Sequence, residues 1–337
     1  MSAPRRVVVT GGAGFIGIHT VARLSQQGWE VLVIDDLRHA CGEPLPTGVQ
    51  LEAVDIGSAA AAASVVRFRP EVILHLAAQG GVSRSVRDPA GDATINVVGT
   101  VAVLKAAVDA GCRRVVMASS GGAIYGQAPR LPAAERTTPR PRSPYGAAKL
   151  AAEGYLAMFG RTFTLSTLAL RYANVYGPHQ DGTGEAGVVA ITCERLLSGR
   201  PPEIRGDGDQ TRDFVFVGDV VEANLRSLLS RAEGPVNIGT GIATSVRTII
   251  DELAAFAPDH RPISFVDERP GEVRHARLAI GRAARILDWS PRTGLRDGLR
   301  QTFVSFQQRT RPSRAPATAA PGGAATRGGP GSPSRSG

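Results

Sequence analysis

Lysine is nearly absent from this chain: of 39 lysine and arginine residues, only Lys105 and Lys149 are lysines. Long apolar runs are also missing. No stretch approaches the roughly 20 residues of a transmembrane helix, and the N-terminus has no signal-peptide core, so we predict no membrane partner. Cysteine is limited to Cys41, Cys112 and Cys193, which show no metal-binding or disulfide spacing. We therefore expect no metal site and a reducing, cytoplasmic location.

Acidic residues are missing from the C-terminal stretch. Residues 309–337 carry five arginines and no Asp or Glu, and they are rich in Pro, Gly, Ala and Ser. Such a segment cannot bury enough apolar surface to offset its ordering entropy, so we predict a disordered basic tail over 309–337. The tail supplies five of the nine net positive charges. The remaining charge is spread thinly, which gives no reason to expect a nucleic-acid partner.

The body of the chain alternates apolar, β-branched runs with helical patterns. This alternation predicts an α/β fold, a doubly wound parallel sheet (Rossmann fold) with a smaller C-terminal α/β substrate-binding region. We expect the cofactor-binding domain over 1–178, with a return of the chain near 213–240, and a mainly substrate-binding domain over 179–308. The expected strands are RRVVVTGG, EVLVIDD, VQLEAVDI, EVILHLAA, RRVVMASS and STLALRYANVYG.

The first of these strands runs directly into a glycine-rich turn. Gly11, Gly14 and Gly17 have the spacing at which a tight turn brings bare backbone and a helix N-terminus to a pyrophosphate. Asp35, at the end of the second strand, can accept hydrogen bonds from ribose hydroxyls and would repel a 2′-phosphate. The pattern predicts NAD as the cofactor, in preference to NADP.

Three residues nearby are less decisive. Asp36 and Arg38 follow Asp35 directly and blur the choice between NAD and NADP. Asp55 ends a later strand, where it either flanks an adenine or is an ordinary strand end.

Tyr145 and Lys149 stand four residues apart in the stretch SPYGAAK, which begins at Ser143. Ser143 is a good N-cap and Pro144 suits the first helical position, so we predict a helix with both side chains on one face. A free tyrosine has a pKa of about 10 and is a poor base at neutral pH. An ammonium nearby stabilises the phenolate, and the fork of an arginine does not replace it well. The pair is therefore a candidate acid–base catalyst; the alternative is an exposed helix face.

Over residues 5–306 the chain resembles the extended short-chain dehydrogenases/reductases, and within them the NAD-dependent nucleotide-sugar 4-epimerases. The closest likeness is to bacterial UDP-glucose 4-epimerases. The motifs that carry the resemblance are TGGAGFIG, HLAA, SSGGAIYG, SPYGAAK, RYANVYGP, GEAGVVAI, GDGDQTRDFVFVGDV and VNIGTG. The resemblance implies a UDP-sugar substrate and a homodimer formed through the helices near 93–110 and 144–160.

The resemblance also implies roles for individual residues. Tyr145 would be the base, Lys149 its partner, and a serine after the fifth strand would complete a triad. The implied substrate contacts are Ser120, Tyr145, Asn174, Val188, Arg212 and Arg269, of which Asn174, Arg212 and Arg269 would hold the diphosphate. The implied cofactor contacts are Gly11, Gly14, Phe15, Ile16, Gly17, Asp35, Asp36, Asp55, Ile56, Leu76, Ala77, Ala78, Asn96, Ser119, Tyr145, Lys149 and Tyr172, the last beside the nicotinamide.

Two registers are open for the triad serine. Counting four residues back from Tyr125 reaches Gly121, whereas counting forward along the strand reaches Ser120. We infer a one-residue insertion in the turn at Gly121 and Gly122, which glycines tolerate because they accept positive φ. The strand end is the rigid reference, so we expect Ser120 to act, and Ser119 to point to the opposite side.

The implied reaction is the interconversion of UDP-glucose and UDP-galactose through a transient 4-keto sugar. Related dehydratases and decarboxylases carry a carboxylate before the Tyr-Gly pair, where this chain has Gly122 and Ala123. This difference favours simple epimerisation. The alternatives are a 4-epimerase of UDP-glucuronic acid or of a UDP-N-acetylhexosamine, another nucleotide-sugar dehydratase or reductase, or a non-catalytic NAD-binding regulator.

Overall fold

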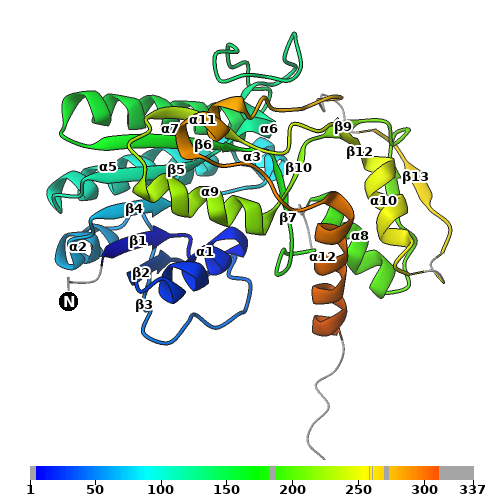
Figure 1. Cartoon of the computed structure of the whole chain (residues 1–337), viewed down its shortest axis with the longest axis horizontal. Helices are drawn as coiled ribbons and strands as arrows, with labels where there is room; N and C mark the ends of the chain where they lie inside the picture. The colour runs from blue at the N-terminus through cyan, green and yellow to red at the C-terminus, as the bar shows by residue number, and fades with distance from the viewer. Residues whose placement is uncertain (1–4, 183–186, 258, 260, 269–272, 311–337) are drawn as a thin grey trace, which may run out of the picture.

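The computed structural model describes residues 5–182, 187–257, 259, 261–268 and 273–310 of the chain. Its larger part is a seven-stranded sheet in the order β11-β6-β5-β4-β1-β2-β3 (Figure 1). Every neighbouring pair in it is parallel. The expected doubly wound α/β fold is therefore confirmed. The strands of this sheet are β1 (Arg6–Thr10), β2 (Glu30–Asp35), β3 (Gln50–Ala53), β4 (Val72–His75), β5 (Arg114–Ser120), β6 (Ser166–Tyr172) and β11 (Gly234–Ile238).

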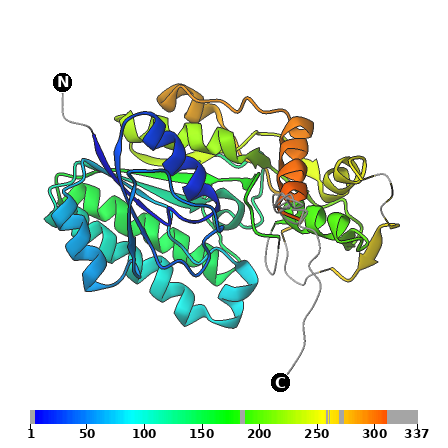
Figure 2. The same cartoon turned by 90° about the horizontal axis from the view of Figure 1, so that it is seen from below.

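Helices cover both faces of the sheet (Figure 2). Side chains alternate across a strand, so Val7 and Val9 of β1 enter one core and Val8 enters the other. The helices on the face of Val7 are α1 (Phe15–Gln26), α9 (Val217–Leu229) and α11 (Gly281–Leu287). Those on the face of Val8 are α2 (Ala59–Phe68), α5 (Gly99–Asp109) and α7 (Pro144–Thr162).

The helix before β5 is less regular than the sequence predicted. It consists of α4 (Pro89–Ala93), a π-helical turn η1 (Thr94–Val98) and α5, and it stops before Gly111, whose φ is +68°. By length and composition Pro89–Asp109 could cross a membrane, the one such helix among the described residues. This is weak evidence, because 44% of its apolar window is buried and α5 packs between α2 and α7.

A smaller lobe lies beyond the carboxyl ends of the strands (Figure 2). Its core contains Phe214, Ile249, Leu253 and Phe303. The chain returns from this lobe to the sheet, since α9 packs on α1 and β11 pairs with β6. The remaining elements are α3 (Val82–Arg87), α6 (Gly121–Ile124), β7 (Asn174–Tyr176), α8 (Val188–Leu197), β8 (Glu203–Arg205), β9 (Thr211–Arg212), β10 (Phe214–Phe216), β12 (Thr244–Ser245), α10 (Val246–Ala254), β13 (Ser264–Val266) and α12 (Leu295–Thr310).

The sixth expected strand is two strands. β6 ends at Tyr172, and β7 leaves the main sheet to pair in parallel with β10. The division falls at Ala173, whose N–H still donates to Ile238 O at 2.8 Å, whereas the N–H of Asn174 donates to Asp213 O at 2.9 Å. The apolar run is continuous across this point, so its periodicity could not reveal the change of partner.

Candidate active site

The glycine-rich turn between β1 and α1 is built as the sequence suggested. Gly11 has φ +69°, and an added Cβ there would lie 2.6 Å from Ala77 N; at Gly17 it would overlap the Gly11 carbonyl. At Gly14 it would meet only Gly11 O, at 3.4 Å, so the outer side of the turn is bare. α1 has no side-chain cap and no acidic residue in its first turn. Its N–H groups are therefore available to an anion.

Asp35 ties this turn to the end of β2. Its Oδ2 accepts from Ala13 N at 3.0 Å and its Oδ1 from Leu37 N at 2.9 Å, and the residue is 8% exposed. A carboxylate has about four acceptor positions, so Asp35 retains capacity for ribose hydroxyls. The bare turn, the uncapped helix and this carboxylate together fit a dinucleotide, with Phe15 and Ile16 in the first turn of α1.

Asp36, Arg38 and Asp55 form a chain of ion pairs beside Asp35. Arg38 contacts Asp36 at 2.6 Å and Asp55 at 3.0 Å. The guanidinium is held by two carboxylates, which disfavours its use for a 2′-phosphate. The expected blurring of the preference for NAD is therefore weaker than the bare sequence suggests.

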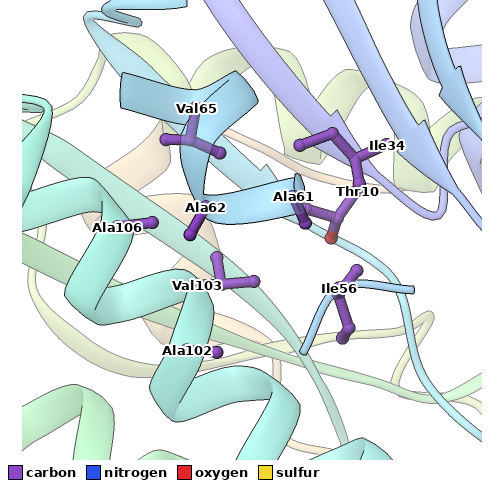
Figure 3. Close-up of a pocket in the computed structure, with 9 residues that line it drawn as sticks. All are labelled: Thr10, Ile34, Ile56, Ala61, Ala62, Val65, Ala102, Val103 and Ala106. Atoms are coloured by element: carbon purple, nitrogen blue, oxygen red, sulfur yellow. The ribbon is translucent and has the colours of Figure 1, made fainter. Parts of the chain in front are cut away.

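Asp55 and Ile56 lie at the same edge but face different surroundings. Asp55 is accessible and accepts from Gly57 N at 2.8 Å. Ile56 is buried and borders an apolar cavity of about 10 Å³ between α2 and α5 (Figure 3), room for about one water molecule. The lining residues of this cavity are Thr10, Ile34, Ile56, Ala61, Ala62, Val65, Ala102, Val103 and Ala106.

A larger groove of about 300 Å³ opens at the carboxyl edge of the sheet. Carboxylates and guanidinium groups lie around it, and its volume is at the lower end of the range for small-molecule sites. The lining residues are Arg38, Asp55, Gln79, Arg84, Asp88, Gly91, Asp92, Thr94 and Ile95.

The segment after β4 is held by buried hydrogen bonds. Leu76 N donates to Thr10 O at 3.0 Å and Ala77 N to Thr10 Oγ1 at 3.2 Å. Ala78 follows, and Gln79 N donates to Asn96 Oδ1 at 3.0 Å. Asn96 lies on the π-helical turn, a feature that recurs at functional sites. Its amide holds this segment in place.

Tyr145 and Lys149 lie on one face of α7, as predicted. Ser143 caps the helix, accepting from Gly146 N at 3.1 Å, and Pro144 is the first helical residue. Lys149 Nζ lies 6.0 Å from the centroid of the Tyr145 ring and donates to Ala118 O at 3.1 Å. Lys149 is 4% exposed.

Burial dominates the protonation of both groups. It raises the pKa of Tyr145 to about 12, although the hydrogen bond from Ser120 lowers it. It lowers the pKa of Lys149 to about 8, against the charges of Asp92 and Glu153. The ammonium was expected to lower the Tyr145 pKa, but burial has the larger effect and raises it. Lys149 alone therefore does not bring the Tyr145 pKa down to neutral pH.

The two serines at the end of β5 point in different directions. Ser120 is hydrogen-bonded to Tyr145, whereas Ser119 Oγ donates to Glu153 Oε1 at 2.6 Å. The reason expected for two glycines in the following turn was wrong, because neither Gly121 nor Gly122 has a positive φ. Gly121 is required for space, because an added Cβ would lie 2.6 Å from Leu278 Cδ1.

Glu153 is the third residue at helical spacing on the face of α7, after Tyr145 and Lys149, and it was not among the predicted site residues. Glu153 forms an ion pair with Arg171 at 2.6 Å, with both side chains at most 10% exposed. Arg171 in turn donates to Tyr125 Oη at 2.8 Å. The spacing of four residues was the available signal, and it passed unnoticed because glutamate is common on exposed helix faces.

Of the expected substrate contacts, Asn174 lies close to Ser120. A Cβ at Gly122 would be 3.6 Å from Asn174 Oδ1 and 4.0 Å from Ser120 Oγ. Arg212, in β9, donates to Arg274 O at 3.1 Å. Val188 begins α8 and packs against the core of the smaller lobe. Arg269 lies outside the described residues.

The Tyr172 hydroxyl is directed toward α9, where it donates to Asn224 Oδ1 at 2.6 Å. Burial raises the pKa of this phenol above its usual range. The hydroxyl is therefore part of the core next to the site.

Comparison with known proteins agrees with this geometry. The chain is 44% identical to a UDP-glucose 4-epimerase of Mycolicibacterium smegmatis, over 90% of this chain and 99% of the relative. The UDP-glucose 4-epimerase of Thermotoga maritima, solved with UDP-glucose, has a TM-score of 0.87 at 40% identity, covering 91% of this chain and 100% of that one. The Thermus thermophilus enzyme, solved with NAD, has a TM-score of 0.84 at 41% identity, covering 90% and 99%. Residues 7–239 match the NAD dependent epimerase/dehydratase family, and the chain belongs to that family.

Proposed function

We propose that this protein is an NAD-dependent 4-epimerase of a UDP-hexose that interconverts UDP-glucose and UDP-galactose through a transient 4-keto sugar. The observation that carries the proposal is the meeting of Ser120, Tyr145 and Lys149 at the carboxyl edge of the sheet, beside a turn that fits a dinucleotide. Relatives at 35–44% identity include two UDP-glucose 4-epimerases and one putative UDP-glucose 4-epimerase.

NAD, when bound, supplies a reversible acceptor for the hydride of the sugar C4. The glycine-rich turn would hold its pyrophosphate and Asp35 its adenosine ribose. Leu76, Ala77 and Ala78 would face it across the groove. We propose that residues 1–178 together with 213–240 form this binding unit, and that 179–308 mainly hold the sugar nucleotide.

The proton of the sugar O4 is handled by residues of this chain. Tyr145 removes it as the hydride leaves C4 and returns it when the hydride comes back on the other face. The Ser120 hydroxyl, already bonded to Tyr145, is placed to relay that proton. Lys149, buried beside the ring, supplies positive charge that favours the phenolate.

The substrate side supports epimerisation over dehydration. The position of Gly122 faces both Asn174 and Ser120, and a carboxylate here would act on neighbouring carbons of the sugar. The chain carries none there. Asn174, Val188, Arg212 and Arg269 are the proposed contacts for the sugar nucleotide, two arginines and an amide being suited to a diphosphate.

We further propose a cytoplasmic homodimer. Val98 is 61% exposed on η1 and Tyr155 42% exposed on α7, while α5 and α7 pack side by side. The three cysteines are free thiols, which supports the cytoplasmic location because thiols stay reduced there. A Val98→Glu variant should sediment as a monomer, whereas a wild-type protein that is already monomeric would contradict the dimer.

Incubation with UDP-glucose, UDP-glucuronic acid and UDP-N-acetylglucosamine, followed by NMR of the products, tests the function. We expect the 4-epimer of UDP-glucose to form fastest. Faster conversion of another sugar would reassign the substrate, and no conversion of any would favour a non-catalytic NAD-binding regulator. Heat-released supernatant of the pure protein should contain NAD; NADP there would contradict the role given to Asp35.

A further inference from the structure

Asp92, in α4, is a buried carboxylate with one oxygen left free. The residue is 2% exposed. Its Oδ1 accepts from Gln79 Nε2 at 2.7 Å and from Asn96 Nδ2 at 3.0 Å. Its Oδ2 is equally buried and has no hydrogen-bond partner among the described residues. Burying a carboxylate is costly unless a positive charge lies near it.

The hydrogen bonds around Asp92 have a defined direction. Thr100 Oγ1 donates to Asn96 O at 2.7 Å, so the contact of 2.9 Å between Thr100 Oγ1 and His75 Nε2 must use the imidazole N–H. His75 Nδ1 then accepts from Thr10 Oγ1 at 2.7 Å. Burial lowers the pKa of His75 to about 3, so this neutral form persists.

The hydrogen bonds of Asn96 also fix which of its amide atoms donates and which accepts. Its Oδ1 accepts from Gln79 N, which assigns Nδ2 as the donor to Gln79 O and to Asp92. Two donors therefore converge on Asp92 Oδ1. Burial raises the pKa of this carboxyl, while the two hydrogen bonds and the charge of Lys149 lower it and so favour the ionised form.

Lys149 is the buried cation whose charge acts on Asp92. α4 and η1 pack against α7, and the charge of Asp92 favours protonated Lys149. The other groups around Lys149 are engaged or neutral: Glu153 is paired with Arg171, while His75 and Tyr145 are uncharged near neutral pH. Asp88, at the start of α4, adds a second carboxylate beside Asp92.

We propose that Asp92 is a positioning residue of the reaction, whose buried charge keeps Lys149 in its ammonium form beside Tyr145. In a site without this carboxylate, burial would release the proton of Lys149 at lower pH. Asp92 also disfavours the phenolate of Tyr145. It therefore sets the pH range in which the pair works, and the kinetic part of this inference rests on the proposed function.

The shortage of lysine makes a direct test possible. Protein labelled with ¹³C only in lysine gives two side-chain signals, those of Lys105 and Lys149. Lys149 should titrate near pH 8 in the wild type. In Asp92→Asn the midpoint should fall by about one pH unit, the size expected for the loss of one nearby charge in a partly buried site. An unshifted midpoint in the folded variant would overturn the proposal, and no substrate is needed to see it.

Two variants serve as controls. Asp109→Asn removes the exposed ion-pair partner of Lys105, so it should leave the Lys149 signal and the turnover unchanged. Asp92→Glu keeps the charge and should restore a midpoint near that of the wild type. If Asp92→Asn does not fold, Asp92→Ser provides the neutral side chain in a smaller volume.

The pH profile of kcat distinguishes the loss of the Asp92 charge from a change in the local structure. Removing the Asp92 charge should move both limbs, that of Tyr145 and that of Lys149, to lower pH by about one unit. A variant in which α4 is merely displaced would lose rate without moving the limbs, and that result would contradict the proposal. A wild-type chain that binds NAD but lacks epimerase activity would refute the proposed function while leaving the lysine titration interpretable.

Discussion

Ser119 and Ser120 are adjacent in the chain and chemically identical, yet the strand turns them to opposite sides. Ser119 bonds to Glu153 at 2.6 Å, and Ser120 bonds to Tyr145. The end of β5 therefore turns only the Ser120 hydroxyl toward Tyr145, and this is the hydroxyl that we propose meets the substrate.

Ser120→Ala should lower kcat by about 10²–10⁴-fold, because it removes a hydroxyl positioned for proton transfer. Ser119→Ala should lower it much less. Steady-state turnover of UDP-galactose by the two purified variants gives the comparison. The reverse ranking would show that the other register is right.

Lys149→Arg should be badly impaired although the charge is kept. The side chain is 4% exposed and Nζ bonds to Ala118 O at 3.1 Å, so a longer, planar fork does not fit the same place. Tyr145→Phe should lose nearly all turnover while retaining fold and bound NAD. Circular dichroism and NAD content verify the fold, and rates like those of the wild type for Lys149→Arg would contradict the assigned role.

At the scale of elements, buried polar links join β1, β4 and α5. Thr10, His75 and Thr100 form one continuous set of hydrogen bonds, with distances of 2.7 and 2.9 Å. Because these links cross between strands and a helix, they hold the edge of the sheet at which the cofactor would bind.

His75 should make the fold sensitive to acid. Its pKa is about 6.5 when unfolded and about 3 in the structure, so below pH 6.5 the unfolded state binds a proton that the folded state does not. The contribution of neutral His75 to the free energy of unfolding is therefore fully present above pH 6.5, and it is lost as the pH drops toward 3. At pH 5 the loss should be about 2 kcal/mol.

Urea unfolding at pH 7 and pH 5 measures this loss. His75→Gln should be less stable at pH 7, and its stability should change less between the two pH values, by about 2 kcal/mol. If both proteins lose the same free energy of unfolding between pH 7 and pH 5, groups other than His75 cause the acid sensitivity.

At the scale of the molecule, the sheet and the smaller lobe are interleaved. α9 and β11 return to the sheet after α8, and Trp289, far along the chain, is buried in the core beside α9. The Trp289 indole N–H donates to Asp219 O at 2.9 Å. The lobes are therefore joined by several crossings of the chain.

Removing residues 312–337 should leave the melting temperature and turnover essentially unchanged. The segment is rich in Pro, Gly and Ala, and it contains no aromatic residue, so no core-forming side chain is lost. Differential scanning calorimetry and the UDP-galactose assay measure the two quantities. A large fall in either would show that the tail contacts the folded part.

The doubly wound fold, the glycine-rich turn with Asp35, and the helix carrying Tyr145 and Lys149 could all be predicted from the amino-acid sequence. These features depend on periodicity, capping and local spacing, which neighbouring residues specify. Three other features became visible only in the folded chain: β7 leaves the main sheet, Arg38 is held by two carboxylates, and Asp92 is buried where its charge acts on Lys149. Those contacts join residues far apart in the chain, and burial there reverses the expected direction of the Tyr145 pKa. No local pattern carries that information, because desolvation depends on what packs around a group.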